Sequence, residues 1–138
     1  WLKHSIDYGI IGFLGLMSVI ALSIAIERHM VYKKIDITKF SHKKMLEIEL
    51  TKKLHILAII GSNAPYIGLL GTVLGIMLTF YAMGQDGLMD TGKIMVGLAL
   101  ALKVTAVGLV VAIPTVATYN VLLRKAKVIM MEWDVKNG

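Results

Sequence analysis

The sequence has no cysteine and few charged residues. Of its 138 residues, 17% are charged and 57% are hydrophobic, whereas soluble domains average about 25% charged and roughly 45–50% apolar. Without cysteine the chain forms no disulfide, no thiolate-ligated metal centre and no cysteine nucleophile. The composition therefore favours a membrane protein over a soluble domain, whose polar residues would be too few to cover its apolar segments.

The patterns that mark common catalytic sites are also missing. The sequence contains no HExxH zinc motif, no Walker A phosphate loop and no GxSxG nucleophile elbow. The histidines at positions 4, 29, 42 and 55 are scattered outside the apolar segments, which disfavours a metal site. We therefore predict a protein that is not an enzyme, with no catalytic residue, no metal and no cofactor.

Three long segments are almost free of charge. Residues 9–26 and 56–85 contain no charged side chain, and residues 94–123 contain only Lys103. A helix that spans a bilayer needs about 20 mainly apolar residues. The second and third segments would reach roughly 45 Å as helices, which exceeds the hydrocarbon core of about 30 Å. The sequence predicts an all-α membrane protein with three transmembrane helices, the second and third projecting into the cytoplasm.

The flanking charges predict the orientation of these helices. Residues 28–55 carry eight Lys or Arg against three acids, and the tail from residue 124 carries four against two. By the positive-inside rule, we expect both to be cytoplasmic and the N-terminus to be periplasmic. Glu27 and Arg28 would then mark the cytoplasmic border of a retained first span. Basic residues placed beside spans favour membrane lipids as partners and argue against nucleic acid.

We expect a single integral membrane domain over residues 1–138. Its helices are predicted at about 6–34, 54–84 and 92–131, with a cytoplasmic helical segment at about 41–54. Ser41 is the expected N-cap of this segment, and its apolar side is expected to contain Met45 and Ile48, with Leu46 and Leu50. The segment and the C-terminal tail are either extensions of the spans or docking surfaces for neighbouring subunits.

Small and hydroxyl residues form a stripe on each of the two longer segments. On a helical wheel of about 100° per residue, the small and hydroxyl residues Gly61, Pro65, Gly68, Gly75 and Thr79 fall within about 60° of Thr72. Ala101, Gly108 and Ala112 likewise fall within about 60° of Thr105. Such a stripe favours either close packing between helices or a lumen shared by several copies, because three helices are too few to enclose a pore.

Both interpretations assign roles to particular residues. In the lumen interpretation, Thr72, Thr105 and Thr79 line an ion pathway. In the packing interpretation, small residues let helix backbones approach, as in the GxxxG pattern from Gly71 to Gly75. Prolines 65 and 114 each free a backbone carbonyl and are expected to kink or soften a helix. The predicted packing and kink residues are Pro65, Gly68, Gly71, Gly75, Gly108, Ala112 and Pro114.

Long motifs in the sequence resemble the ExbB/TolQ/MotA proton-channel family. SNAPYIGLLGTVLGIMLTF (62–80) and GLALALKVTAVGLVVAIPTVATYN (97–120) resemble its two signature spans, and AIERHMVYKK (25–34) resembles the acid-base end of its first span. Three spans with an outer N-terminus match ExbB and TolQ better than the four-span MotA. By family position, Thr72 and Thr105 correspond to lumen threonines.

The resemblance implies a stator in the bacterial inner membrane. ExbB-like proteins form a homo-oligomer, a pentamer, around an ExbD-like single-span protein, and use the proton-motive force to drive a TonB-like protein in transport across the outer membrane. Two alternatives stay open. One is a TolQ-like motor subunit for envelope maintenance, and the other is a structural membrane scaffold that passes no ions.

The third span departs from the family where ExbB and TolQ commonly place a glutamate. This chain has Leu100 at that position, which cannot relay a proton, and Lys103 follows three residues later. A lysine at the centre of a bilayer costs about 2.5–3.5 kcal/mol on insertion scales. Lys103 is therefore either a structural lysine that reaches toward water, or a counter-charge to a partner's carboxylate that compensates for the absent glutamate. The expected proton carrier is an acid on the partner.

Overall fold

The computed structural model describes residues 2–86 and 91–137, and within these ranges every regular element is a helix. The elements are α1 (Leu2–Lys34), η1 (Ile37–Lys39), α2 (Lys43–Thr51), α3 (Leu54–Asp86) and α4 (Thr91–Asn137). Helices α1, α3 and α4 are long and apolar enough to cross a membrane, which confirms the prediction of three such helices. Helix α4 continues to Asn137, past the predicted end near residue 131.

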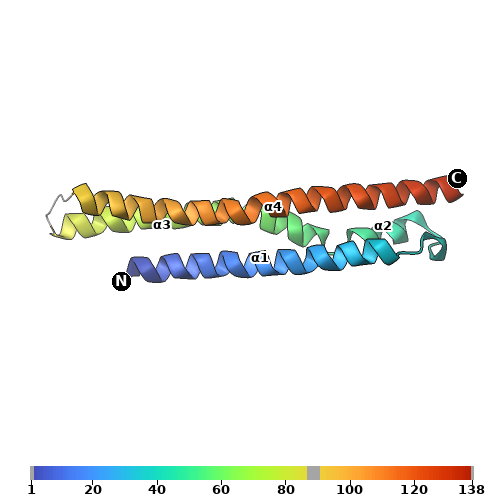
Figure 1. The fold of residues 1–138 in the computed structure, drawn as a ribbon, viewed down its shortest axis with the longest axis horizontal. Coiled ribbons are helices and arrows are strands. Elements are labelled where there is room, and N and C mark those ends of the chain that lie inside the picture. Colours follow the sequence, from blue (N-terminus) through green and yellow to red (C-terminus); the bar gives the residue numbers. More distant parts are fainter. Residues whose placement is uncertain (1, 87–90, 138) are drawn as a thin grey trace.

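The three long helices lie side by side in an elongated bundle (Figure 1). Helices α3 and α4 run antiparallel along most of α3, and α1 lies against both. The first turns of α1 stop short of the ends at which α3 and α4 are connected, whereas the last turns of α4 extend beside α2 (Figure 1). One end of the bundle therefore consists of α3 and α4 alone.

Helix α1 buries one face against α3 and α4. Leu14, Met17, Ala21 and Ile24 are buried and recur every three or four residues, which places them on one side of the helix. The opposite side is also apolar, and its Leu16 is 56% exposed. A helix that is apolar all round is typical of one that contacts lipid on the side its neighbours leave open.

The structure corrects the predictions for the short helix α2. Its N-cap is His42, so Ser41 does not cap it, and the His42 side chain makes no capping hydrogen bond. The buried residues are Leu46 and Leu50, whereas Met45 and Ile48 are 58% and 70% exposed. The reason is tertiary: α2 has apolar residues on two faces, and the Leu46–Leu50 face is the one that packs into the bundle core.

The C-terminal part of α4 holds the segment between α1 and α2. Trp133 donates its indole N–H to the Phe40 carbonyl at 3.0 Å, and the ammonium of Lys43 lies 2.6 Å from the Asp134 carboxylate. In the same segment, Asp36 accepts hydrogen bonds from the hydroxyl and backbone N–H of Thr38, which hold the pKa of Asp36 below its usual range. The tail thus docks on its own chain.

Candidate functional site

The two predicted lumen threonines meet at the seam between α3 and α4. The hydroxyls of Thr72 and Thr105 are hydrogen-bonded to each other, and Thr72 Oγ1 lies 2.8 Å from the Ala101 carbonyl oxygen. Each hydroxyl has one hydrogen, so Thr72 can donate to Ala101 and accept from Thr105. With Thr72 only 6% exposed, this chain of hydrogen bonds is shielded and links the two helices.

Glycines allow the two helix backbones to touch at this seam. A Cβ added to Gly108 would lie 2.7 Å from the Ala64 carbonyl oxygen and 3.1 Å from Gly68 Cα. A Cβ added to Gly68 would lie 3.0 Å from the Val104 carbonyl oxygen. The two predicted stripes therefore face each other within one chain, as close helix packing requires.

Several of the other predicted packing residues lie along the same seam. Gly71 packs against Val104, and Ala112 is buried. Thr79 is buried, and its hydroxyl lies 2.8 Å from the Gly75 carbonyl oxygen in its own helix. Pro65 and Pro114 lie inside α3 and α4, and neither ends its helix.

Helix α1 covers only one edge of the seam. Its Ile10 side chain reaches the point where Gly71 meets Val104. Thr72 and Thr105 each follow one of these contact residues, so each lies about 100° further round its helix. The wheel places both on the side away from α1. We call the seam around Thr72 and Thr105 the threonine edge. It is not covered by α1, and at this edge Thr72 is buried whereas Thr105 is half-buried.

Lys103 is not part of this cluster. It is exposed on α4, about 160° from Thr105 on the wheel, and forms no hydrogen bond or ion pair within residues 2–86 and 91–137. Leu100, at the position of the family glutamate, is half-buried. The structure thus leaves the Lys103 ammonium on an exposed face of α4, without an acceptor among the residues that the structure describes.

Sequence reasoning missed a carboxylate on the packed face of α1. Asp7 was not predicted as a site residue, but its Oδ1 atom is buried and has no hydrogen-bond partner in the described part of the chain. Asp7 lies about one turn, or roughly 4.5 Å, from Ile10. Its spacing of seven residues from the buried Leu14 was the available signal, because such residues share a helix face.

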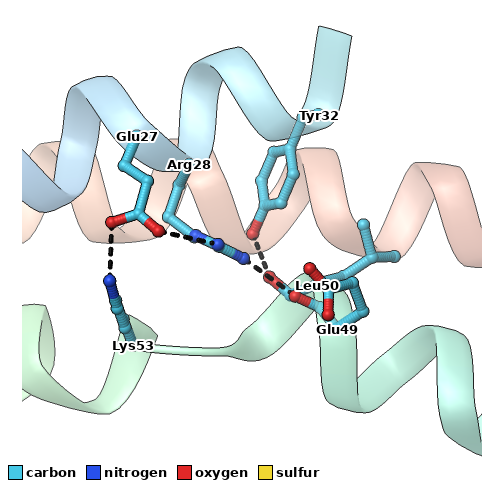
Figure 2. Close-up of polar contacts among 6 residues, drawn as sticks. All are labelled: Glu27, Arg28, Tyr32, Glu49, Leu50 and Lys53. Atoms are coloured by element: carbon cyan, nitrogen blue, oxygen red, sulfur yellow. Dashed lines mark hydrogen bonds and ion pairs between the residues drawn. The ribbon is translucent and has the colours of Figure 1, made fainter. Parts of the chain in front are cut away.

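Glu27 and Arg28 form the centre of a second polar cluster, which joins α1 to the α2–α3 junction (Figure 2). Arg28 is 2% exposed, and its Nη1 donates to the Glu49 carbonyl at 2.8 Å. Glu27 lies 3.3 Å from Arg28 Nη2 and 2.7 Å from the Lys53 ammonium. Tyr32 donates its hydroxyl to the Leu50 carbonyl. We call this set the junction cluster.

The junction cluster satisfies the end of α2. The last carbonyls of a helix have no partner inside it, and two of those in α2 accept hydrogen bonds from Arg28 and Tyr32. The chain then turns at Lys53, whose φ of 68° is left-handed, before α3 begins. Tyr32 and Lys53 were not predicted as site residues. Tyr32 continues the buried spacing of α1, which is the signal that could have identified it.

The chain is similar to known proteins over most of its length. A model of the MotA/TolQ/ExbB proton channel family matches residues 22–135. The biopolymer transport protein ExbB of Aquifex aeolicus is 53% identical over 137 residues, covering 99% of this chain and 93% of that protein. The biopolymer transport protein ExbB of Helicobacter pylori strain J99 is 54% identical over 134 residues, covering 97% of this chain and 92% of that protein.

Proposed function

Because the chain belongs to the MotA/TolQ/ExbB proton channel family, we propose that it couples the proton-motive force to TonB-dependent active transport across the outer membrane. Identity above 50% to proteins named ExbB, over nearly the whole chain, carries this proposal. Because these relatives are named ExbB, they do not favour a TolQ-like role. The chain is a multi-pass membrane protein, and in this function it acts as a channel and stator subunit rather than an enzyme.

The proposed assembly is a pentamer in the bacterial inner membrane. Its N-terminus is periplasmic and its C-terminus cytoplasmic, as the excess of Lys and Arg in residues 28–55 and in the tail favours. The pentamer surrounds the transmembrane helix of an ExbD-like protein and acts on a TonB-like protein. In this arrangement α1 lies on the outside, because it covers the edge of the α3–α4 seam opposite the threonines.

The proposed ion pathway runs along the threonine edge. The half-buried Thr105 offers its hydroxyl to water at this edge, Thr72 holds Thr105 in place through their hydrogen bond, and Thr79 lies about two turns further along α3. Leu100 offers no carboxylate for a relay, so an acid on the ExbD-like partner carries the proton. Lys103 serves as a counter-charge outside the threonine edge, and its acceptor comes from another chain.

A test must separate conduction from packing, because the threonine hydroxyls also join α3 to α4. We compare Thr72→Val and Thr105→Val with Thr72→Ser and Thr105→Ser in a strain that lacks the native gene. An ion pathway predicts that Ser retains TonB-dependent uptake and Val abolishes it at equal protein levels in the membrane. A scaffold that passes no ions predicts full uptake from the Val variants, and that result would refute the proposal.

A further inference from the structure

A basic groove lies between α1 and α4 where both helices leave their apolar segments. It has a volume of about 330 Å³. Its rim carries Lys33, Arg124 and Lys125, together with His29, and no acid is among its lining residues. Val128 and Ile129 form an apolar floor. Three cations around an apolar surface have no counter-ion in the groove itself.

A second, apolar groove lies along the same helix pair. This second groove, of about 150 Å³, is lined mainly by residues 18–25 of α1 and 110–118 of α4. Ala25 precedes His29 by four residues, and Thr118 precedes Lys125 by seven, so the two grooves share one face of each helix. The distance from Thr118 to Arg124 is six residues, or roughly 9 Å along α4. The apolar groove and the cationic cluster thus follow one another along the α1–α4 pair.

The hydrogen bond inside the cluster leaves donors available for an anion. Lys125 Nζ lies 3.3 Å from His29 Nδ1. An ammonium has no lone pair, so Lys125 donates and Nδ1 accepts, and the imidazole proton is on Nε2. The cluster therefore presents one imidazole N–H, one guanidinium and two ammonium groups. Phosphate oxygens are strong acceptors for such donors.

We propose that this pair of grooves binds an anionic phospholipid of the cytoplasmic leaflet. The phosphate contacts Lys33, Arg124 and Lys125, and one acyl chain lies in the apolar groove. The charge of the rim selects an anionic headgroup over a zwitterionic one. This inference rests on the membrane orientation of the proposed function, but it does not require that the protein conducts ions.

Lipid binding to the delipidated full chain in a neutral detergent tests the inference. Native mass spectrometry measures binding of phosphatidylglycerol and of phosphatidylcholine with the same acyl chains. One variant combines Lys33→Gln, Arg124→Gln and Lys125→Gln. The matched control combines Lys44→Gln, Lys52→Gln and Lys127→Gln, which removes the same charge from exposed positions outside the groove.

Each basic residue near an anionic surface contributes about fivefold to binding, so the groove variant should lose on the order of a hundredfold in affinity for phosphatidylglycerol. The control should keep its preference for phosphatidylglycerol. Equal binding of the two lipids by the unaltered chain, or an equal loss in both triple variants, would overturn the inference. So would competition by glycerol phosphate at the same concentration as the lipid, which would indicate a site for free anions.

A second variant tests the apolar groove without changing charge. Ser18 is exposed and lines that groove, so Ser18→Leu should fill it and weaken phosphatidylglycerol binding several-fold while the fold is kept. Unchanged affinity in this variant would overturn the placement of the acyl chain. Because binding is measured on the purified chain, its outcome is independent of the uptake assay that tests the proposed function.

Discussion

The contact between Gly108 and the Ala64 carbonyl predicts a loss of stability from a single methyl group. In Gly108→Ala the added Cβ would lie 2.7 Å from the Ala64 oxygen, about 0.7 Å short of ordinary van der Waals contact at 3.4 Å. The obstacle is helix backbone, so no rotamer change relieves it. Helices α3 and α4 must separate, which also stretches the hydrogen bonds of the Thr72–Thr105 pair.

The magnitude follows from two opposing terms. Forcing extra volume into a close-packed interface typically costs about 2 kcal/mol. Alanine is better than glycine in a helix interior by about 1 kcal/mol. We therefore expect Gly108→Ala to lower the free energy of unfolding by about 1 kcal/mol or more. Gly15→Ala is the control, because nothing lies within 4 Å of its added Cβ, and it should be neutral or stabilising by up to about 1 kcal/mol.

Unfolding in mixed micelles with increasing sodium dodecyl sulfate, followed by far-ultraviolet circular dichroism, measures both variants in the same detergent. The sign of the difference is the result that matters: Gly108→Ala should unfold at lower denaturant than the unaltered chain, and Gly15→Ala should not. If Gly108→Ala is as stable as Gly15→Ala, the two backbones do not touch at this position. The packing role of the small-residue stripes would then be wrong.

Three further predictions concern the junction cluster and the exposed lysine. Arg28→Met leaves a carbonyl at the end of α2 without its charged donor, so α2 should lose about 1.5–3 kcal/mol of local stability, seen as faster hydrogen exchange in α2 than in α3. At Lys53 the left-handed backbone favours glycine, so Lys53→Gly should be more stable than Lys53→Ala by about 1 kcal/mol in denaturant unfolding. If Lys103 is a counter-charge, Lys103→Met should reduce TonB-dependent uptake and Lys103→Arg should retain it, and normal uptake with Met would assign the lysine a structural role only.

The membrane spans could be predicted because a charge in a bilayer is expensive enough to override local effects. An uncharged segment such as residues 56–85 has few alternatives to a transmembrane helix, and α3 occupies it. The sequence did not predict which side of each helix packs against protein and which side is exposed. In α1 both Leu14 and Leu16 are apolar, yet Leu14 is fully buried and Leu16 is 56% exposed. Hydrophobicity does not distinguish a protein neighbour from lipid.

Small residues do distinguish a protein neighbour from lipid. For this reason the α3–α4 seam was the most predictable part of the candidate site. Glycine and threonine gain nothing from lipid, so a stripe of them marks a surface that meets something else. The stripes predicted around Thr72 and Thr105 lie together in the structure. The sequence left open whether that surface meets a helix or a lumen, because both require the same small side chains.

The contacts of Arg28 and Tyr32 with α2 could not be predicted because their acceptors are backbone atoms. Arg28 and Tyr32 hydrogen-bond to carbonyl oxygens of residues 49 and 50, and a carbonyl has no signature in the sequence. The same contacts fix which face of α2 is buried. The sequence placed Met45, Ile48, Leu46 and Leu50 on one apolar side, and only Leu46 and Leu50 are buried, because tertiary hydrogen bonds decided which face of α2 packs into the bundle.

The seam between α3 and α4 and the junction cluster together define how the three long helices are held to one another. Helices α3 and α4 touch through glycine backbones, which makes them one stiff unit. Helix α1 meets that unit through side chains such as Ile10, and hydrogen bonds and an ion pair tie it to the α2–α3 junction at the junction cluster. Under the proposed function, a proton that changed contacts along the threonine edge would act on the stiff unit, and α1 would follow through the junction cluster.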